Sequence, residues 1–299
     1  MNPIKPIKIE KDMKVSDLVS NLKNCGFNAK RLGEATDILK KVIQDEECKL
    51  FVSFAGALVP AGMKQIFIDM IDKKMIDVLV TTGANLTHDL IEALGFEHYH
   101  YDGKEDDSEL RKKGFDRIYN VLMKNEVYEK LEKWFEEHFD ELNSQSNTEF
   151  LLKIGKLVEN TNSILATCYK NNIPLFCPAL SDSGIGLMIW SMMTRKKKPL
   201  MQEYNDLPKI IDIAWKHKKK AVFYIGGGTP KNYTQQAMQF SSPAQFGVQI
   251  KIDDESFGGS SGAPLKEGIS WGKIDEKAQF IDVTCDATIA LPLIYSGLL

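Results

Sequence analysis

The sequence lacks the features that mark membrane, secreted and nucleic-acid-binding proteins. No apolar run approaches the roughly 20 residues that span a bilayer, and the opening residues, MNPIKPIKIEKDMKV, contain no apolar core of a signal peptide. The 38 lysine and arginine residues face 41 aspartate and glutamate residues, which gives a net charge of -3. Nucleic acids and anionic membranes bind proteins that carry an excess of positive charge, so we expect neither as a partner. Because the sequence has no membrane-spanning run and no signal-peptide core, we expect a cytoplasmic protein.

Metal-binding and disulfide patterns are also absent. The five cysteines have no paired CxxC spacing, so they indicate neither a disulfide framework nor a zinc site. His98, His100, His138 and His217 have no ligand-type partners at the spacing of a metal site. We therefore predict buried free thiols and no metal.

Apolar runs alternate along the chain with stretches of helical spacing. With 299 residues and 43% hydrophobic content, the chain can fill one large core or two small ones. Six runs have the length of strands buried on both faces. They are CKLFVSFAG, IDVLVTTGA, IPLFCPAL, KAVFYIGGG, FGVQIKID and FIDVTCD. Residues 61–75 place Met63, Ile66, Phe67 and Met70 on one helical face, and residues 207–219 end in a basic turn that suits a helix C-terminus. The alternation predicts an α/β doubly wound fold with a mostly parallel, Rossmann-like sheet.

Two regions differ from this pattern. Residues up to about 47 are polar and helical in spacing, with Gly26 and Gly33 as expected breaks, and we interpret them as an N-terminal helical arm. Residues 102–146 form a charged, aromatic-rich insertion whose Leu131 and Phe135 fall on one helical face. We expect that face to pack in the core or against another subunit.

Small and polar loops follow several of the predicted strands. Gly226, Gly227 and Gly228 would let the backbone turn tightly and approach a ligand, although the same triplet can be a tight turn without one. The carboxyl ends of parallel strands share one edge, so the loops at Thr82, Asp182 and 286–287 should converge there with the triplet. A dinucleotide site follows from that convergence. Asp182 and Asp286 would accept hydrogen bonds from ribose hydroxyls, or would instead cap the helices that follow them.

A second group of residues lies in SSGAPLKEGISWGKI, residues 260–274. Here Glu267, Trp271 and Lys273 bring a carboxylate, an aromatic wall and an amine into one short segment. That grouping suits a cationic amine substrate, and Lys273 is either a nucleophile or an ordinary surface lysine. His88, in TTGANLTHD, could point into the same crevice. We expect the NAD-type site and the lysine to lie side by side.

At GGGTPKN, SSGAPLKEGISWGKI and CDAT the sequence resembles the deoxyhypusine synthase family. The likeness continues through most of the chain, with further segments in the family's order. These are CKLFVSFAGALVPAGMKQI, MIDVLVTTGANLTHDLI, DRIYNVLMKNEVYEKLEKW, NNIPLFCPAL and DATIALPLI. The resemblance implies a single NAD-binding domain of the deoxyhypusine synthase type over residues 1–299, with the helical arm at its N-terminus.

The resemblance also implies an activity in polyamine metabolism. The family's enzymes are NAD-dependent transferases, usually homotetramers with sites between paired subunits, and they move the butylamine part of spermidine through an imine on a lysine. Here that lysine is Lys273, with Trp271 along the methylene chain and Glu267 at a cationic nitrogen. Asn232 and His88 would also meet the substrate. The cofactor positions that carry over are Thr82, Asp182, Gly226, Gly227, Gly258, Asp286 and Ala287.

The sequence departs from the family at its polyamine-binding positions. Asn232 replaces a histidine, Leu187 and Ser260 replace acids that hold the amine, and Phe257 replaces another acid of the glycine-rich loop. Thr87 and His88 also replace an acidic pair of the family, and Gly56 and Ala57 replace a Ser-Asn pair. Because each lost carboxylate removes an ion pair to an ammonium, a paralogue with another amine donor or acceptor is the leading hypothesis. It is a transferase of the deoxyhypusine or homospermidine synthase type, acting on a small amine or a protein lysine. Authentic hypusine synthesis on a translation factor, and an inactive NAD-binding scaffold, are the alternatives.

Overall fold

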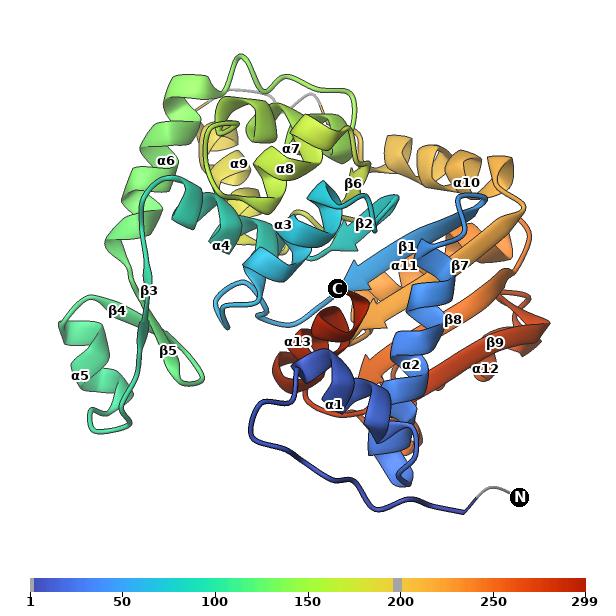
Figure 1. Ribbon diagram of the computed structural model, residues 1–299. Coiled ribbons are helices and arrows are strands. Elements are labelled where there is room, and N and C mark those ends of the chain that lie inside the picture. Colours follow the sequence, from blue (N-terminus) through green and yellow to red (C-terminus); the bar gives the residue numbers. More distant parts are fainter. Residues whose placement is uncertain (1–2, 196–200) are drawn as a thin grey trace. The chain divides into compact units, whose positions relative to one another are not determined.

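The structure is a computed structural model that describes residues 3–195 and 201–299 (Figure 1). Its main sheet has six strands in the order β6-β2-β1-β7-β8-β9. The strands are β1 (Cys48–Phe54), β2 (Val78–Thr81), β6 (Leu175–Phe176), β7 (Lys219–Ile225), β8 (Ala244–Lys251) and β9 (Ile274–Thr284). Each lies within or overlaps one of the six apolar runs of the sequence, so the prediction of a mostly parallel α/β sheet is confirmed.

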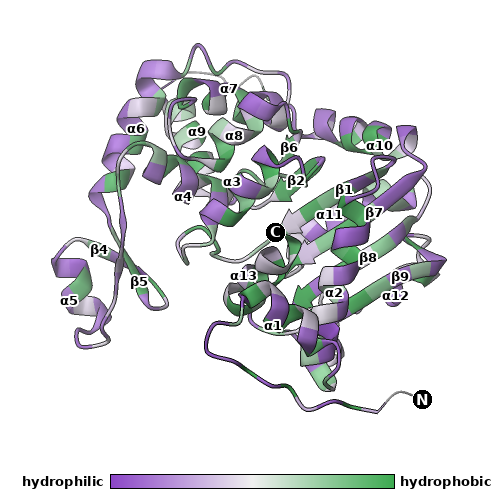
Figure 2. Cartoon of the chain, viewed as in Figure 1, coloured by the Kyte–Doolittle hydropathy of each residue, from purple (hydrophilic) through white to green (hydrophobic). Residues whose placement is uncertain are grey.

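The central strands are parallel and buried on both faces. β7 pairs with β1 on one side and with β8 on the other, and β8 pairs with β9, all in parallel register. Phe51, Val52 and Phe223 are fully buried although successive side chains point to opposite faces of the sheet. Strands covered on both sides are continuously apolar, which is why the runs were visible in the sequence. Figure 2 shows the hydrophobic residues concentrated on these strands.

The chain divides into two compact units. Unit 1 comprises Met1–Ala55, Lys74–Val80 and Leu207–Leu299, and unit 2 comprises Gly56–Lys73 and Thr81–Asp206. The predicted single domain over residues 1–299 stays a prediction.

Unit 1 carries helices on the sheet that it contains. They are α1 (Val15–Leu22), α2 (Phe27–Ile43), α10 (Asp206–Lys216, from its second residue on), α11 (Gly228–Gln239), α12 (Glu267–Ser270) and α13 (Ala287–Leu298). A single 3-10 turn, η2 (Glu255–Phe257), follows β8. Figure 1 shows α2 and α13 in front of the sheet, with α11 and α12 behind it. Helices on both faces of a parallel sheet are the doubly wound arrangement.

The N-terminal stretch is helical, as its spacing predicts, and its α2 packs against β9 and β8 of the same unit. Gly26 precedes α2 as the expected break. The prediction of a second break at Gly33 is wrong, because this residue lies inside α2. A Cβ at Gly33 would come within 2.9 Å of the backbone nitrogen of Lys23 and 3.1 Å of the carbonyl oxygen of Val19. Gly33 therefore allows α1 to pack closely on α2.

Unit 2 is mostly helical. Its helices are α3 (Lys64–Asp72), α4 (Gly83–Ala93), α5 (Asp107–Lys112), α6 (Glu126–His138), α7 (Asn147–Leu157), α8 (Ile164–Asn171) and α9 (Gly184–Thr194), with the 3-10 turn η1 (Glu203–Asn205). In α6, Leu131 and Phe135 are buried, which confirms that the apolar face of the insertion packs in a core. A small antiparallel sheet in the order β3-β5-β4 was not predicted. Its strands, β3 (His98–His100), β4 (Phe115–Ile118) and β5 (Val121–Lys124), are too short for a period of two to be recognised.

Candidate functional site

A glycine turn joins β7 to α11. Gly226 and Gly228 have φ values of 75° and 61°, which side chains other than glycine rarely adopt. A Cβ at Gly227 would lie 2.2 Å from the Cα of Ser261, so glycine at this position allows the segment around Ser261 to approach. No side chain caps the N-terminus of α11 at Gly227. The first amides of this twelve-residue helix therefore remain available for an anionic group such as a phosphate.

Lys231, in the first turn of α11, fixes the glycine-rich loop of residues 258–263. Its side chain is 1% exposed, and Nζ donates hydrogen bonds to the carbonyl oxygens of Ser260 at 2.7 Å and Ala263 at 2.6 Å. The ammonium also lies 5.9 Å from the centre of the Tyr224 ring. Burial lowers the pKa of Lys231 to about 8. Sequence reasoning missed this residue, although a lysine three positions after a glycine triplet was a signal that could have found it.

The other predicted cofactor residues of unit 1 lie in turns after strands. Gly258 ends the turn η2 with φ 69° and has open space around the position of a Cβ. Asp286 follows β9 and caps α13, which begins at Ala287, by accepting a hydrogen bond from Thr288 N at 2.7 Å. The hydrogen bond from the Thr288 hydroxyl, followed by that from Thr288 N, lowers the pKa of Asp286. Of the two roles expected for Asp286, the structure shows the helix cap, and the ribose contact stays a prediction.

Glu267, Trp271 and Lys273 lie around α12. Glu267 is its first residue, and Gly272, with φ 68°, turns the chain so that Lys273 N donates to the carbonyl oxygen of Gly268 at 2.8 Å. Nζ of Lys273 lies 5.0 Å from the centre of the Trp271 ring, which is 56% exposed. Burial lowers the pKa of Lys273, and the charge of Glu267 opposes this shift. Among the described residues, no hydrogen bond or ion pair engages Nζ of Lys273.

Lys273 and the glycine turn are not at the same edge of the sheet. The carbonyl oxygen of Lys273 accepts a hydrogen bond from Ala244 N, where β8 begins, and Lys273 immediately precedes β9. Gly226 N instead donates to Ile250 O, near the end of β8, and Asp286 follows the end of β9. The six residue steps of β8 from Ala244 to Ile250 correspond to roughly 20 Å of strand at about 3.3 Å per residue. The charges of Lys273 and Glu267 nevertheless act on the ammonium group of Lys231 in the first turn of α11, so their side chains are within electrostatic reach of the helix that follows the glycine turn. That the lysine and the NAD-type site lie side by side stays a prediction.

Three predicted site residues lie in unit 2. Thr82 caps α4 by accepting hydrogen bonds from the backbone and side-chain nitrogens of Asn85 at 3.4 and 3.1 Å. Asp182 is exposed and is not the cap of α9, because the hydroxyl of Ser183 accepts the hydrogen bond from Gly186 N. His88, on α4, is partly buried and contacts His98. Sequence reasoning had set His98 aside.

The positions at which the sequence departs from the family's polyamine-binding residues carry neutral side chains. Leu187 on α9 is 53% exposed, Phe257 is 79% exposed, and Asn232 on α11 is also exposed. Ser260 donates its hydroxyl to the carbonyl oxygen of Gly228 at 3.3 Å, which ties it to the glycine turn. A polyamine at these positions would meet neutral groups.

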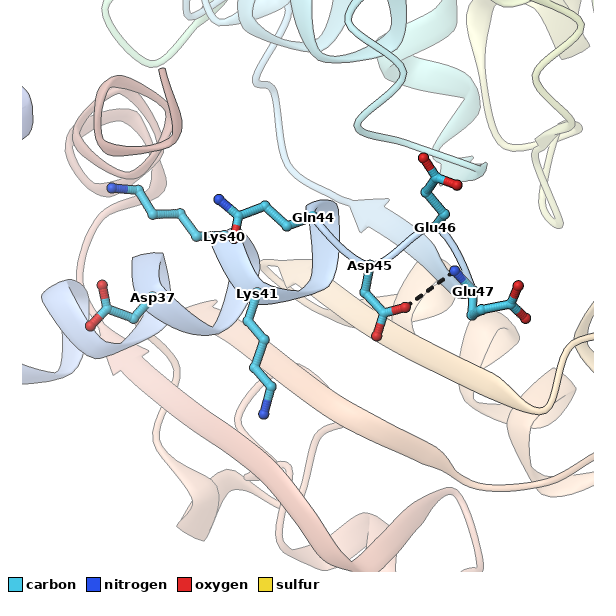
Figure 3. A pocket seen from close by; sticks show the side chains of 7 residues that line it. All are labelled: Asp37, Lys40, Lys41, Gln44, Asp45, Glu46 and Glu47. Atoms are coloured by element: carbon cyan, nitrogen blue, oxygen red, sulfur yellow. Dashed lines mark hydrogen bonds between the residues drawn. The ribbon is translucent and has the colours of Figure 1, made fainter.

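Two surface pockets lie elsewhere in unit 1. One is lined by charged side chains at the end of α2, among them Lys41, Asp45 and Glu47 (Figure 3). The other lies beside Arg31, whose guanidinium donates to the carbonyl oxygen of Asp282 at 2.9 Å. Neither is lined by Lys273. Across residues 3–195 and 201–299, no group of three or more potential metal ligands occurs, and no helix has the length and apolarity needed to cross a membrane.

The mostly parallel sheet, covered by helices on both faces and followed by a glycine turn, defines an α/β protein of the doubly wound class. Residues 17–298 match the protein family described as deoxyhypusine synthase. The chain belongs to this family, whose members are transferases that use NAD and take an aminobutyl group from spermidine.

Archaeal relatives match over nearly the whole chain. The "Probable deoxyhypusine synthase" of Methanosarcina thermophila is 38% identical over 99% of this chain and 94% of its own length. Archaeoglobus fulgidus has two such relatives, numbered 1 and 2. They are 38% and 37% identical over 98% and 92% of this chain, and over 96% and 94% of their own lengths. The two identities are nearly equal, so sequence identity does not indicate which of the two relatives this chain resembles more.

A solved structure supports the fold. A crystal structure from Entamoeba histolytica, assigned to the same family, aligns with a TM-score of 0.69 and 20% sequence identity, covering 98% of this chain and 96% of that one. At this identity the comparison concerns the fold, which agrees with the α/β architecture expected from the sequence.

Proposed function

We propose that this protein is an NAD-dependent aminoalkyl transferase that carries its amine-derived group as an imine on Lys273. The observation that carries the proposal is the state of this amine. It lies beside the Trp271 ring, and burial lowers its pKa. No described residue forms a hydrogen bond or an ion pair with its Nζ. A lysine attacks a carbon only as the neutral amine, so a lowered pKa favours the reaction.

The residues of unit 1 fit a dinucleotide. The uncapped N-terminus of α11 and the turn at Gly226 and Gly227 would hold a phosphate, and the open surroundings of Gly258 leave room for a ligand against the backbone. The chemistry that NAD supplies is removal of a hydride from the carbon beside the donor nitrogen, and its later return. Thr82, Asp182, Asp286 and Ala287 are the further positions at which we expect the cofactor to be held.

Each residue around Lys273 has a defined task. Lys273 attacks the oxidised donor carbon and releases the remaining amine, and a second amine then displaces Lys273. Trp271 lies along the methylene chain and excludes water, because water would hydrolyse the imine. Glu267 holds a cationic nitrogen or accepts its proton, and Asn232 meets the substrate from α11.

The charges of Lys273 and Glu267 act on Lys231 beside the glycine turn, which supports an amine site next to the cofactor site. The resemblance further implies a homotetramer with sites between paired subunits. Gel filtration with light scattering measures the number of subunits.

Donor identity distinguishes the proposal from authentic deoxyhypusine synthesis. The neutral side chains at Leu187 and Ser260 favour a donor or acceptor other than the spermidine and translation factor of that reaction. The archaeal relatives' names favour the authentic reaction, which remains the second candidate.

The deciding experiment traps the imine. The purified protein is incubated with NAD and spermidine, putrescine or agmatine, reduced with borohydride and examined by mass spectrometry. An adduct on Lys273 establishes the mechanism, and its mass gives the transferred group. Label passing from spermidine to a translation-factor lysine would select the authentic reaction. If NAD binds and none of the three amines gives an adduct, the result favours the inactive scaffold or a donor other than these three.

A further inference from the structure

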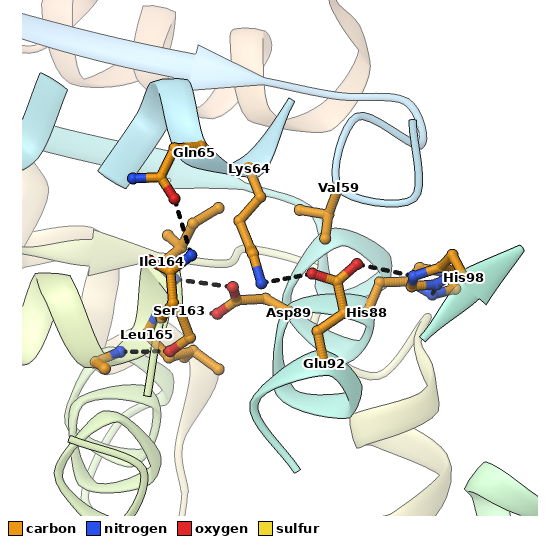
Figure 4. Close-up of polar contacts among 12 residues, drawn as sticks. Val59, Lys64, Gln65, His88, Asp89, Glu92, His98, Ser163, Ile164 and Leu165 are labelled. Carbon is orange, nitrogen blue, oxygen red and sulfur yellow. Dashed lines mark hydrogen bonds and ion pairs between the residues drawn. The ribbon is translucent and has the colours of Figure 1, made fainter. Parts of the chain in front are cut away.

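A row of hydrogen-bonded side chains crosses three elements of unit 2 (Figure 4). Lys64 of α3 and His98 of β3 bind opposite oxygens of Glu92 on α4, with Nζ to Oε2 at 2.5 Å and Nδ1 to Oε1 at 2.8 Å. The other ring nitrogen of His98, Nε2, lies 2.9 Å from Nδ1 of His88. The side chain of His98 is 7% exposed and that of Glu92 is 21% exposed, so the inner part of the row is shielded from water.

The carboxylate of Glu92 determines which nitrogens carry protons. Burial alone would raise the pKa of Glu92, but hydrogen bonds from His98 and Lys64 outweigh it and lower the pKa. Glu92 therefore accepts at both oxygens, and His98 must donate through Nδ1. A neutral His98 then has Nε2 as an acceptor, so His88 donates to it through Nδ1. The remaining nitrogen of His88, Nε2, keeps its lone pair.

The outer nitrogen of His88 is the open end of the row. Among the residues that the structure describes, none forms a hydrogen bond with Nε2 of His88. Burial and the neighbouring His98 lower the pKa of His88 to about 4, while Glu92 acts in the opposite direction. Of the other ionisable groups around it, Asp89 points away and accepts hydrogen bonds from Ile164 N and Leu165 N at 2.8 and 2.9 Å. His88 is therefore neutral near pH 7.

We propose that Glu92, His98 and His88 form a proton relay that accepts a proton from the ammonium group of an amine substrate at Nε2 of His88. This inference rests on the proposed function and deepens it by naming how a substrate amine becomes nucleophilic. Glu92 and His98 are positioning residues, and His88 is the residue that meets the amine.

The proton transfer is balanced along the row. The substrate ammonium loses one proton, and a new N–H bond forms at Nε2 of His88. The Nδ1–H bond of His88 breaks as its proton moves to Nε2 of His98. His98 becomes an imidazolium beside the carboxylate of Glu92, and His88 returns to the neutral state. The substrate is left as a neutral amine, which is the form that acts as a nucleophile.

The tautomer of His88 tests the relay without any activity. In ¹⁵N-histidine-labelled protein at pH 7.5, we expect Nδ1–H and an unprotonated Nε2 for His88, which is the minor tautomer of free histidine. Glu92→Gln should shift His88 toward the common Nε2–H tautomer, because an amide no longer requires donation from His98. His100→Gln is the matched control, since His100 lies on the same strand as His98 and is exposed. An Nε2–H tautomer of His88 in the unmodified protein would overturn the relay.

Transfer kinetics test the role of the relay. His88→Gln should slow formation of the transferred product at least about 100-fold, because glutamine cannot take up a proton. Glu92→Gln should slow it about 10-fold, as for the loss of a group that orients another. Both variants should keep the far-ultraviolet circular dichroism spectrum and NAD affinity of the unmodified protein.

The outcomes separate the two proposals. An unmodified protein that forms no adduct with any donor contradicts the proposed function, and the substrate role of His88 falls with it. An unmodified protein that transfers, together with a His88→Gln variant of equal rate, leaves the proposed function standing and overturns the relay.

Discussion

Lys231 and Lys273 are two lysines of unit 1 with lowered pKa values, and they differ in what their amines touch. Lys231 is fully buried, and its Nζ donates to the carbonyl oxygens of Ser260 and Ala263. Lys273 is partly buried and faces the exposed ring of Trp271, with no described hydrogen-bond partner. Burial lowers both pKa values, so a lowered pKa by itself does not identify a nucleophile. The amine of Lys231 orders a loop through its hydrogen bonds, whereas the amine of Lys273 has no such partner among the described residues and can react.

The largest expected effect comes from removing the free amine. Lys273→Ala should abolish the borohydride-trapped adduct, with a loss of at least about 100-fold, while NAD affinity changes little. Lys277→Ala is the control, because Lys277 is an exposed lysine four residues further along. Adduct formation is measured by mass spectrometry and NAD binding by calorimetry. An adduct that persists in Lys273→Ala would give the covalent role to another lysine.

Removing the occupied amine should affect stability instead. Lys231→Met leaves two carbonyl oxygens of the loop without their donor, which costs about 1–3 kcal/mol of unfolding free energy. Urea unfolding measures the change, and Lys266→Met, at an exposed lysine nearby, should be close to neutral. Lys231→Met with unchanged stability and a lost adduct would reverse the two assignments.

The lowered pKa of Lys231 adds a pH dependence to that experiment. The folded state binds its proton more weakly than the unfolded state, with pKa values of about 8 and 10.5. The contribution of Lys231 to stability is therefore present above pH 10.5 and is lost as pH falls through 8. Relative to Lys231→Met, the unmodified protein should gain stability between pH 8 and 10.5. A constant difference would mean that the two carbonyl oxygens keep the amine protonated.

The contact between the glycine turn and the loop can be broken by one methyl group. In Gly227→Ala the new Cβ would lie 2.2 Å from the Cα of Ser261, so the loop must move at a cost of about 1–3 kcal/mol. The free energy of unfolding and the NAD affinity should both fall. Gly259→Ala is the control, because there the nearest atom is the Ser261 hydroxyl at 3.7 Å. Equal effects of the two substitutions would contradict the close approach.

The smallest expected effect sharpens the difference in reactivity. Trinitrobenzenesulfonate reacts with neutral amines, so at pH 8 Lys273 should be modified faster than exposed lysines, and Lys231 should be protected by its two acceptors. The charge of Glu267 raises the pKa of Lys273. Glu267→Gln should therefore lower that pKa and speed the modification at pH 8. Peptide mapping measures both rates, and a slower reaction in Glu267→Gln would contradict the electrostatic role.

Much of the fold was predictable because a parallel sheet buried on both faces leaves continuous apolar runs in the sequence. The strand after residue 274 was recognised only from Phe280 on, because the residues that begin β9 are polar and partly exposed. The small sheet of unit 2 was missed for a related reason. Its strands have only three or four residues and carry no period that differs from a loop.

The sequence by itself determined the α/β class, the family and the residue types of the candidate site. The glycine turn and the group of Glu267, Trp271 and Lys273 were predictable because each is formed by residues that are close together in the sequence. The tertiary structure decided which amine is free, because occupancy depends on carbonyl oxygens about 30 residues away from Lys231. It also decided that Lys273 and the glycine turn stand at opposite ends of the strands, and that Glu92, His98 and His88 meet. These relations depend on where separate elements pack, and no short-range pattern in a sequence records that.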